Sequence, residues 1–111
     1  MTPFIKQVKI IFILVCANLA LVGCSSGPDH SEGMAIVNSK CKVCHASGIN
    51  GAPILGNKKM WSPRIEQGKE TLVSHAMNGY GLMPAKGGND ALTEVEISKA
   101  IGYMMSLVQE K

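Results

Sequence analysis

The clearest hydrophobic pattern in the chain lies near its C-terminus. Thr93 followed by Glu96 is a capping-box pattern, which marks the start of a helix. Apolar residues then recur every three or four positions, as one face of a helix requires. These are Ile97, Ala100, Ile101, Met104, Met105 and Val108. The pattern predicts an amphipathic helix that runs to the C-terminus.

A second helical pattern precedes the middle of the chain. Met34, Val37, Cys41 and Cys44 follow one another at steps of three or four residues, and Ser31 is a candidate cap. Shorter helices are expected near 63–66 and over 69–77, the latter ended by Asn78 and Gly79. The segments between them are rich in glycine, and no run alternates as a strand does. We therefore expect an all-α fold of about four helices with long loops. A domain this small needs something large among such loops to complete its core.

The N-terminal segment has the layout of an export signal. Lys6 and Lys9 precede an uncharged, mostly apolar run over 10–22, shorter than the roughly 20 residues of a membrane-spanning helix. The end of this run, "LVGC", resembles the bacterial lipobox, in which the cysteine becomes the lipidated first residue. The alternative is ordinary cleavage near Gly23. We expect a signal peptide over 1–23, a flexible tether over 24–30 that begins at lipidated Cys24, and one domain over 31–111.

The charge of the mature chain excludes one class of partner. Without the two signal lysines, nine Lys and Arg face eight Asp and Glu, a net charge of about +1. No basic stripe with interleaved aromatic residues occurs, so nucleic acid is not an expected partner.

The segment "CKVCH" carries the candidate chemistry. Cys41 and Cys44 at this spacing are compatible with half of a zinc site, a redox dithiol, a disulfide or a haem attachment point. A zinc site lacks its second ligand pair, a redox dithiol lacks the βαβ pattern, and a disulfide leaves His45 without a role. Covalent haem accounts for all three residues, because two thioether bonds leave the adjacent histidine to bind the iron. We favour haem, with the others as alternatives.

An electron carrier also needs a sixth iron ligand. The candidates are Met60, Met77, Met83, Met104, Met105 and His75. Met83 lies in a glycine-rich loop and is followed by Pro84, so its sulfur can face the iron without belonging to a helix. The other methionines are better explained as core residues. We therefore expect His45 and Met83 to bind the iron, with His75 as the rival to Met83.

Together these motifs resemble a bacterial class I cytochrome c, closest to the cytochrome c5 group. The resemblance rests on "CKVCH", "GAP", "MWSPRIEQG", "NGYGLMPAKGG" and the terminal helix, and it covers nearly all of 33–108. It implies helices wrapped around one haem c, with the first and last helices crossing. It also implies that the carbonyl of Pro53 accepts a hydrogen bond from His45, and that Trp61 and Arg64 approach the haem propionates.

Several further residues are expected around the haem. Ile54, Leu55 and Leu82 are candidates for its apolar wall, and Gly33 and Tyr103 for the helix crossing. No second cysteine pair is present, so no disulfide near the distal loop is expected.

The function implied is electron transfer rather than catalysis. We expect a monomeric, non-enzymatic carrier on the periplasmic side, anchored to a membrane through lipidated Cys24. Its partners would be transient redox proteins: a quinol-oxidising complex, a terminal oxidase or a periplasmic reductase. Lys42, Lys58, Lys59 and Lys86 could steer an acidic partner, or simply be solvated. The alternatives are a haem-based sensor or a small peroxidase, each with an open sixth position.

Overall fold

The computed structural model describes residues 27–109, and within them the secondary structure consists of helices joined by loops, with one isolated bridge between Tyr80 and Met83. The helices are α2 (Ser31–Ile36), α3 (Lys42–His45), α4 (Lys58–Ile65), α5 (Lys69–Asn78) and α6 (Glu94–Gln109), with short turns η2 (Val37–Cys41), η3 (Ile49–Gly51) and η4 (Ala85–Gly88). The expected signal peptide and Cys24 lie outside the described residues. No helix of the described part is long and apolar enough to cross a membrane.

The first helical pattern forms one continuous segment made of α2, η2 and α3. Its middle part, η2, is a turn of π-helix, in which the N–H of Lys42 donates to the carbonyl of Val37. The segment begins at Ser31 itself, and the carboxylate of Asp29 accepts the Ser31 N–H at 2.9 Å. The expectation that Ser31 caps the helix was therefore wrong, because the side chain that binds the free N–H comes two residues earlier.

The middle helices agree with the sequence patterns in number but not fully in length. α4 starts at Lys58, ahead of the predicted 63–66, because the Asn57 side chain accepts the Met60 N–H at 3.1 Å. Pro63 lies inside α4 rather than at its first turn. α5 ends at Asn78 with Gly79 as its C-cap, one residue beyond the predicted 69–77.

The capping box of α6 is formed. The Glu96 carboxylate accepts the Thr93 N–H at 2.9 Å and the Thr93 hydroxyl at 2.8 Å, while the Glu96 N–H donates to that hydroxyl at 3.3 Å. The hydrogen bond from the Thr93 backbone, more than any other interaction, lowers the pKa of Glu96. Of the predicted apolar face, all positions are buried except Met105, which is half-buried.

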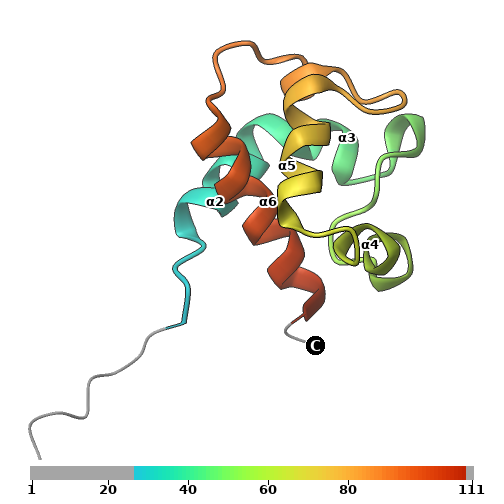
Figure 1. Cartoon of the computed structure of the whole chain (residues 1–111), viewed down its shortest axis with the longest axis vertical. Coiled ribbons are helices and arrows are strands. Elements are labelled where there is room, and N and C mark those ends of the chain that lie inside the picture. Colours follow the sequence, from blue (N-terminus) through green and yellow to red (C-terminus); the bar gives the residue numbers. More distant parts are fainter. Residues whose placement is uncertain (1–26, 110–111) are drawn as a thin grey trace, which may run out of the picture.

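α2 and α6 cross in direct contact (Figure 1). Gly33 is buried at the crossing, where a Cβ would lie 2.2 Å from the Lys99 carbonyl oxygen and 3.0 Å from Cβ of Tyr103. The lack of a side chain at Gly33 therefore sets how closely the two helices approach. An exposed ion pair between Lys99 and Glu32 joins the same two helices. The predicted placement of Gly33 and Tyr103 is confirmed.

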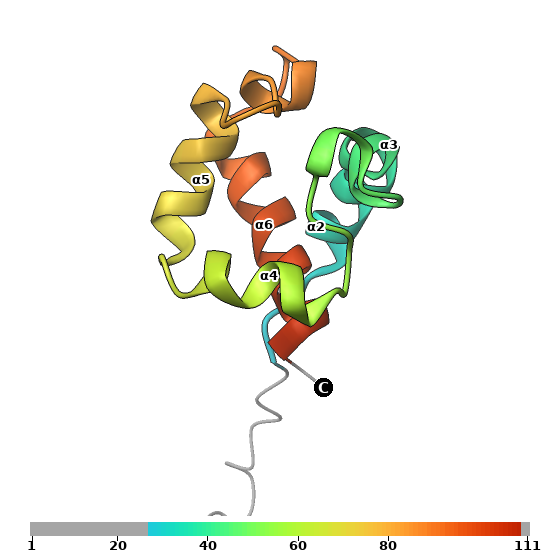
Figure 2. The ribbon, with the colours of Figure 1, turned by 90° about the vertical axis from the view of Figure 1, so that its right-hand side faces the viewer.

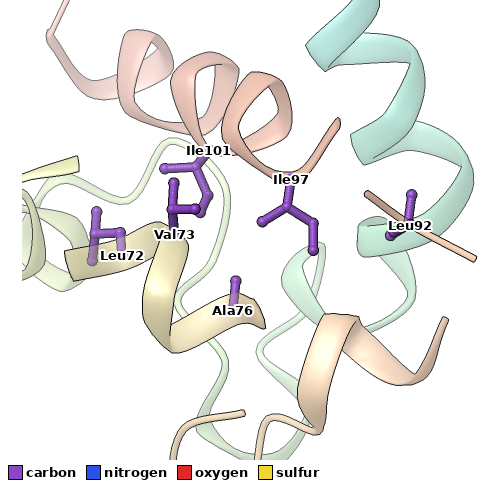
Figure 3. Packing of buried hydrophobic residues seen from close by; sticks show 6 residues of the cluster. All are labelled: Leu72, Val73, Ala76, Leu92, Ile97 and Ile101. Carbon is purple, nitrogen blue, oxygen red and sulfur yellow. The ribbon is translucent and has the colours of Figure 1, made fainter. Parts of the chain in front are cut away.

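The core consists of two clusters that share α6. One cluster joins α5 to α6, with Val73 and Ile101 pointing toward each other (Figure 3). It comprises Leu72, Val73, Ala76, Leu92, Ile97 and Ile101. The other, which we call the Trp61 cluster, comprises Val37, Trp61, Ala100, Met104 and Val108. Because α6 supplies residues to both, it is the helix around which the domain is built.

Candidate functional site

A cavity of about 630 Å³ opens between the two core clusters. In Figure 2, α3 and the loop after it lie on one side of the domain, α5 on the other, α6 between them and α4 below. All of these elements line the cavity. Its floor is apolar, because residues of both clusters face it, including Leu72, Ile97 and Met104. The volume is in the range of pockets that hold organic ligands.

Cys41 and Cys44 both line this cavity, are half-buried, and are not joined by a disulfide. Burial raises the pKa of the Cys41 thiol. Redox-active dithiols have the opposite property, a lowered thiol pKa, so the environment of Cys41 counts against thiol exchange. Among residues 27–109, no three His, Cys, Asp or Glu side chains are arranged to hold a metal ion between them, which counts against a zinc site.

His45 ends α3 and is buried in the cavity wall. Its Nδ1 lies 2.9 Å from the carbonyl oxygen of Pro53, the contact that the resemblance to cytochromes c implies. A carbonyl oxygen can only accept a hydrogen bond, so Nδ1 carries the proton. Nε2 therefore keeps the lone pair with which a neutral imidazole binds a metal.

The loop between α3 and α4 is fixed by hydrogen bonds at both ends. The Leu55 N–H donates to the His45 carbonyl at 2.9 Å, and the Trp61 indole N–H donates to the Ile54 carbonyl at 2.8 Å. Because Pro53 lies in the same stretch, these bonds also fix the carbonyl that orients His45. The Trp61 ring is buried, with its centroid 6.3 Å from that of His45.

The cavity lining narrows the choice of a second ligand. Met83, Met104 and His75 line the cavity, whereas Met60, Met77 and Met105 are not among its lining residues. Met104 is 5% exposed and packs in the Trp61 cluster. Met83 is half-buried in the turn after α5, where no helix restricts its side chain.

The charges around the cavity have one sign. Lys40, Arg64 and Lys86 are among the lining residues, and no Asp or Glu is. One Arg64 N–H donates to the Met60 carbonyl at 2.5 Å, which leaves its other donors available. The Trp61 indole N–H is already bonded to Ile54, so Trp61 offers its ring rather than a donor. The site therefore favours a ligand that is mainly apolar and carries negative charge.

Two of the expected wall residues lie elsewhere. Ile54 and Leu55 are not among the lining residues, and Leu55 packs against the Trp61 cluster instead. Hydrogen bonds of the Leu55 N–H to His45 and of the Ile54 carbonyl to Trp61 hold the backbone of this stretch in place. Leu82 does line the cavity and is 73% exposed. Sequence reasoning missed the stack of His75 on Tyr80, which no spacing pattern indicates.

Comparison with known proteins relates this chain to cytochromes c. The family described as "Cytochrome C oxidase, cbb3-type, subunit III" matches residues 28–104, which include both cysteines, His45 and Met83. Cytochrome c-555 of Chlorobaculum tepidum is 44% identical over 96 residues, 83% of this chain and 89% of that protein. Cytochrome c5 of Azotobacter vinelandii is 31% identical over 87 residues, 77% of this chain and 98% of that protein.

A solved structure gives the same relationship in three dimensions. It is described as the crystal structure of an electron transfer complex of nitrite reductase with cytochrome c. The matching chain is 40% identical, and the match has a TM-score of 0.66. It covers 69% of this chain and 94% of that one.

Proposed function

Since this chain belongs to the class I monohaem cytochromes c, near the cytochrome c5 group, we propose that it carries single electrons through a haem c ligated by His45 and Met83. As in the rest of the family, one haem c is bound covalently, here through Cys41 and Cys44. The observation that carries the assignment of His45 as an iron ligand is the hydrogen bond from its Nδ1 to Pro53. It leaves Nε2 free to bind the iron beside the two free thiols.

The residues of the cavity fit a haem. The apolar floor suits the macrocycle, and Lys40, Arg64 and Lys86 suit its two propionates. Both thiols line the space that the ring would occupy. Met83 offers a soft thioether from another part of the lining, the turn after α5.

The side chains then have distinct roles. When bound, haem c supplies an iron that accepts and releases one electron at a time. Pro53 holds His45 in the metal-binding tautomer, so the ring does not reorient between oxidation states. Met83 and the apolar lining favour the reduced form, because a thioether donor and a low dielectric both disfavour the extra charge of the oxidised form. Electron transfer needs no acid–base pair. The carrier accepts one electron from a reduced partner protein and then passes it to an oxidised partner protein.

Transient contacts with larger redox proteins fit this role. The matching solved chain is a cytochrome c in an electron transfer complex with nitrite reductase. By analogy, we propose a small docking face around the cavity, whose lining includes the exposed Leu82 and Lys86. The candidate partner classes are a quinol-oxidising complex, a terminal oxidase and a periplasmic reductase.

The first experiment tests covalent haem and closed coordination together. The full chain is produced in a bacterium that matures c-type cytochromes, and spectra are recorded before and after reduction. We expect the chromophore to stay with the protein through acid–acetone extraction, and to be lost in the double variant C41S/C44S. We also expect the reduced protein to be unchanged by carbon monoxide, because Met83 fills the sixth position. Rapid carbon monoxide binding would contradict the carrier function and favour a sensor or a peroxidase.

We further propose that the mature protein is periplasmic and lipid-anchored through Cys24, on the basis of the "LVGC" sequence alone. Two or more acyl chains hold a protein on a membrane much more firmly than one does. After cell fractionation, the wild-type protein is therefore expected with membranes and C24A in the soluble periplasmic fraction. Equal distribution of the two proteins would contradict the anchor. Haem spectra of both provide the control for folding.

A further inference from the structure

The ring of His75 stacks on the ring of Tyr80. Their centroids are 4.0 Å apart and their planes differ by 13°. His75 lies in the last turn of α5, and Tyr80 follows just beyond the end of that helix. Both residues line the cavity. The stack therefore joins a rigid helix to the chain segment that leads to Met83.

Tyr80 and Met83 are also joined through their backbones. The Tyr80 N–H donates to the Met83 carbonyl and the Met83 N–H to the Tyr80 carbonyl, both at 3.0 Å. These reciprocal bonds close a tight turn that includes Gly81, whose φ of +57° suits glycine. At Gly79, with φ +85°, a Cβ would lie 3.1 Å from the Met83 carbonyl oxygen. The position of the Met83 backbone is therefore tied closely to that of Tyr80.

We propose that His75 and Tyr80 are positioning residues, whose stack holds the 80–83 turn so that the Met83 sulfur stays on the iron. This proposal rests on the proposed ligation by Met83. The stack fixes the Tyr80 ring to α5, and the two backbone hydrogen bonds carry that constraint to Met83.

A role in the hydrophobic core does not account for the stack. Tyr80 is 60% exposed, and neither residue belongs to either core cluster. The His75 side chain makes no hydrogen bond within the described residues, so its position is not explained by a polar contact. A stacked pair contributes about 0.5–1.5 kcal/mol. Losing that contribution raises the population with Met83 off the iron by about two- to tenfold, since 1.4 kcal/mol is a factor of ten.

The test is a titration of the oxidised, haem-loaded full chain with imidazole. Imidazole binds the iron only where Met83 has left, so its apparent affinity reports that population. The band that arises from sulfur-to-iron charge transfer reports Met83 directly. In Y80A and H75A, imidazole should bind about two- to tenfold tighter than in wild type. The double variant should behave like either single variant, because both remove one contact.

Two conservative variants serve as matched controls. Y80F and H75F each keep an aromatic ring in the stack, so both should bind imidazole as the wild type does. H75F also removes every nitrogen that could bind iron at this position. An intact sulfur band in H75F therefore excludes His75 as the ligand.

The outcomes separate this inference from the proposed function. A wild-type protein without the sulfur band would overturn Met83 ligation, and the positioning role with it. A wild-type band together with unchanged imidazole affinity in Y80A and H75A would overturn the positioning role alone. Additive effects in the double variant would also overturn it, because they would show two independent contributions. Both Ala variants remove side chains outside the core clusters, so the folded state should persist.

Discussion

Replacing Met83 by alanine is expected to abolish the sulfur-to-iron band while the haem stays covalently attached. Among the described residues, Met83 is the only sulfur-bearing side chain that lines the cavity outside both a helix and the cysteine motif. Without its thioether, the oxidised form is less disfavoured, so the reduction potential should fall. The fall should lie within the range of about 0.8 V over which axial ligands set haem potentials. Spectra and a potentiometric titration of wild type and M83A measure both effects.

Met105 provides the matched control for this prediction. It is half-buried against the cluster between α5 and α6, but it is not among the cavity-lining residues. M105A should therefore lower the stability of the fold while the sulfur band and the potential stay unchanged. Met104 does line the cavity, so M104L tests the remaining sulfur. Loss of the band in M104L but not in M83A would reverse the assignment.

Replacing Gly33 by alanine should destabilise the fold more than any exposed substitution. The new Cβ would lie 2.2 Å from the Lys99 carbonyl oxygen, and that atom belongs to the backbone of α6, so α2 and α6 would have to separate. Overpacking of this kind costs about 1–3 kcal/mol. A urea denaturation curve of the haem-loaded protein should show a lower midpoint for G33A. The slope of the transition should be unchanged.

Gly102 is the control, because it is also a helical glycine near a helix contact. A Cβ there would first meet Nζ of Lys69 at 3.4 Å, the flexible end of a side chain. G102A should therefore leave stability unchanged or raise it by up to about 1 kcal/mol, since alanine has the higher helix propensity. Similar losses in G33A and G102A would show that the crossing of α2 and α6 does not depend on close approach at Gly33.

Sequence patterns were sufficient to predict a structural feature wherever all the residues that form it lie in one short segment. Thr93 and Glu96 cap α6 as predicted, because a capping box lies within four consecutive residues. The start of α4 was missed, since Pro63 was the more obvious signal and the cap at Asn57 has no apolar pattern beside it. The π-turn over Val37–Cys41 was missed as well, because spacings of three and four residues do not distinguish one helical turn from another.

The sequence by itself determined the candidate chemistry. Two cysteines and a histidine at fixed spacing, and a methionine followed by proline in a glycine-rich loop, are local patterns that can be recognised without coordinates. The amphipathic period of α6 likewise determined which of its faces is buried.

The tertiary structure alone decided which side chains share the cavity. Leu55 packs against the core and Leu82 lines the cavity, although both leucines lie in glycine-rich loops. His75 came to stack on Tyr80 because the chain reverses after Gly79. Such contacts depend on the path that each loop takes through the fold. Hydrogen bonds such as those of His45 and Trp61 help to determine that path. These bonds form between a side chain and a backbone carbonyl seven or eight residues away, and any residue can supply that carbonyl. Periodicity and residue type therefore do not reveal them.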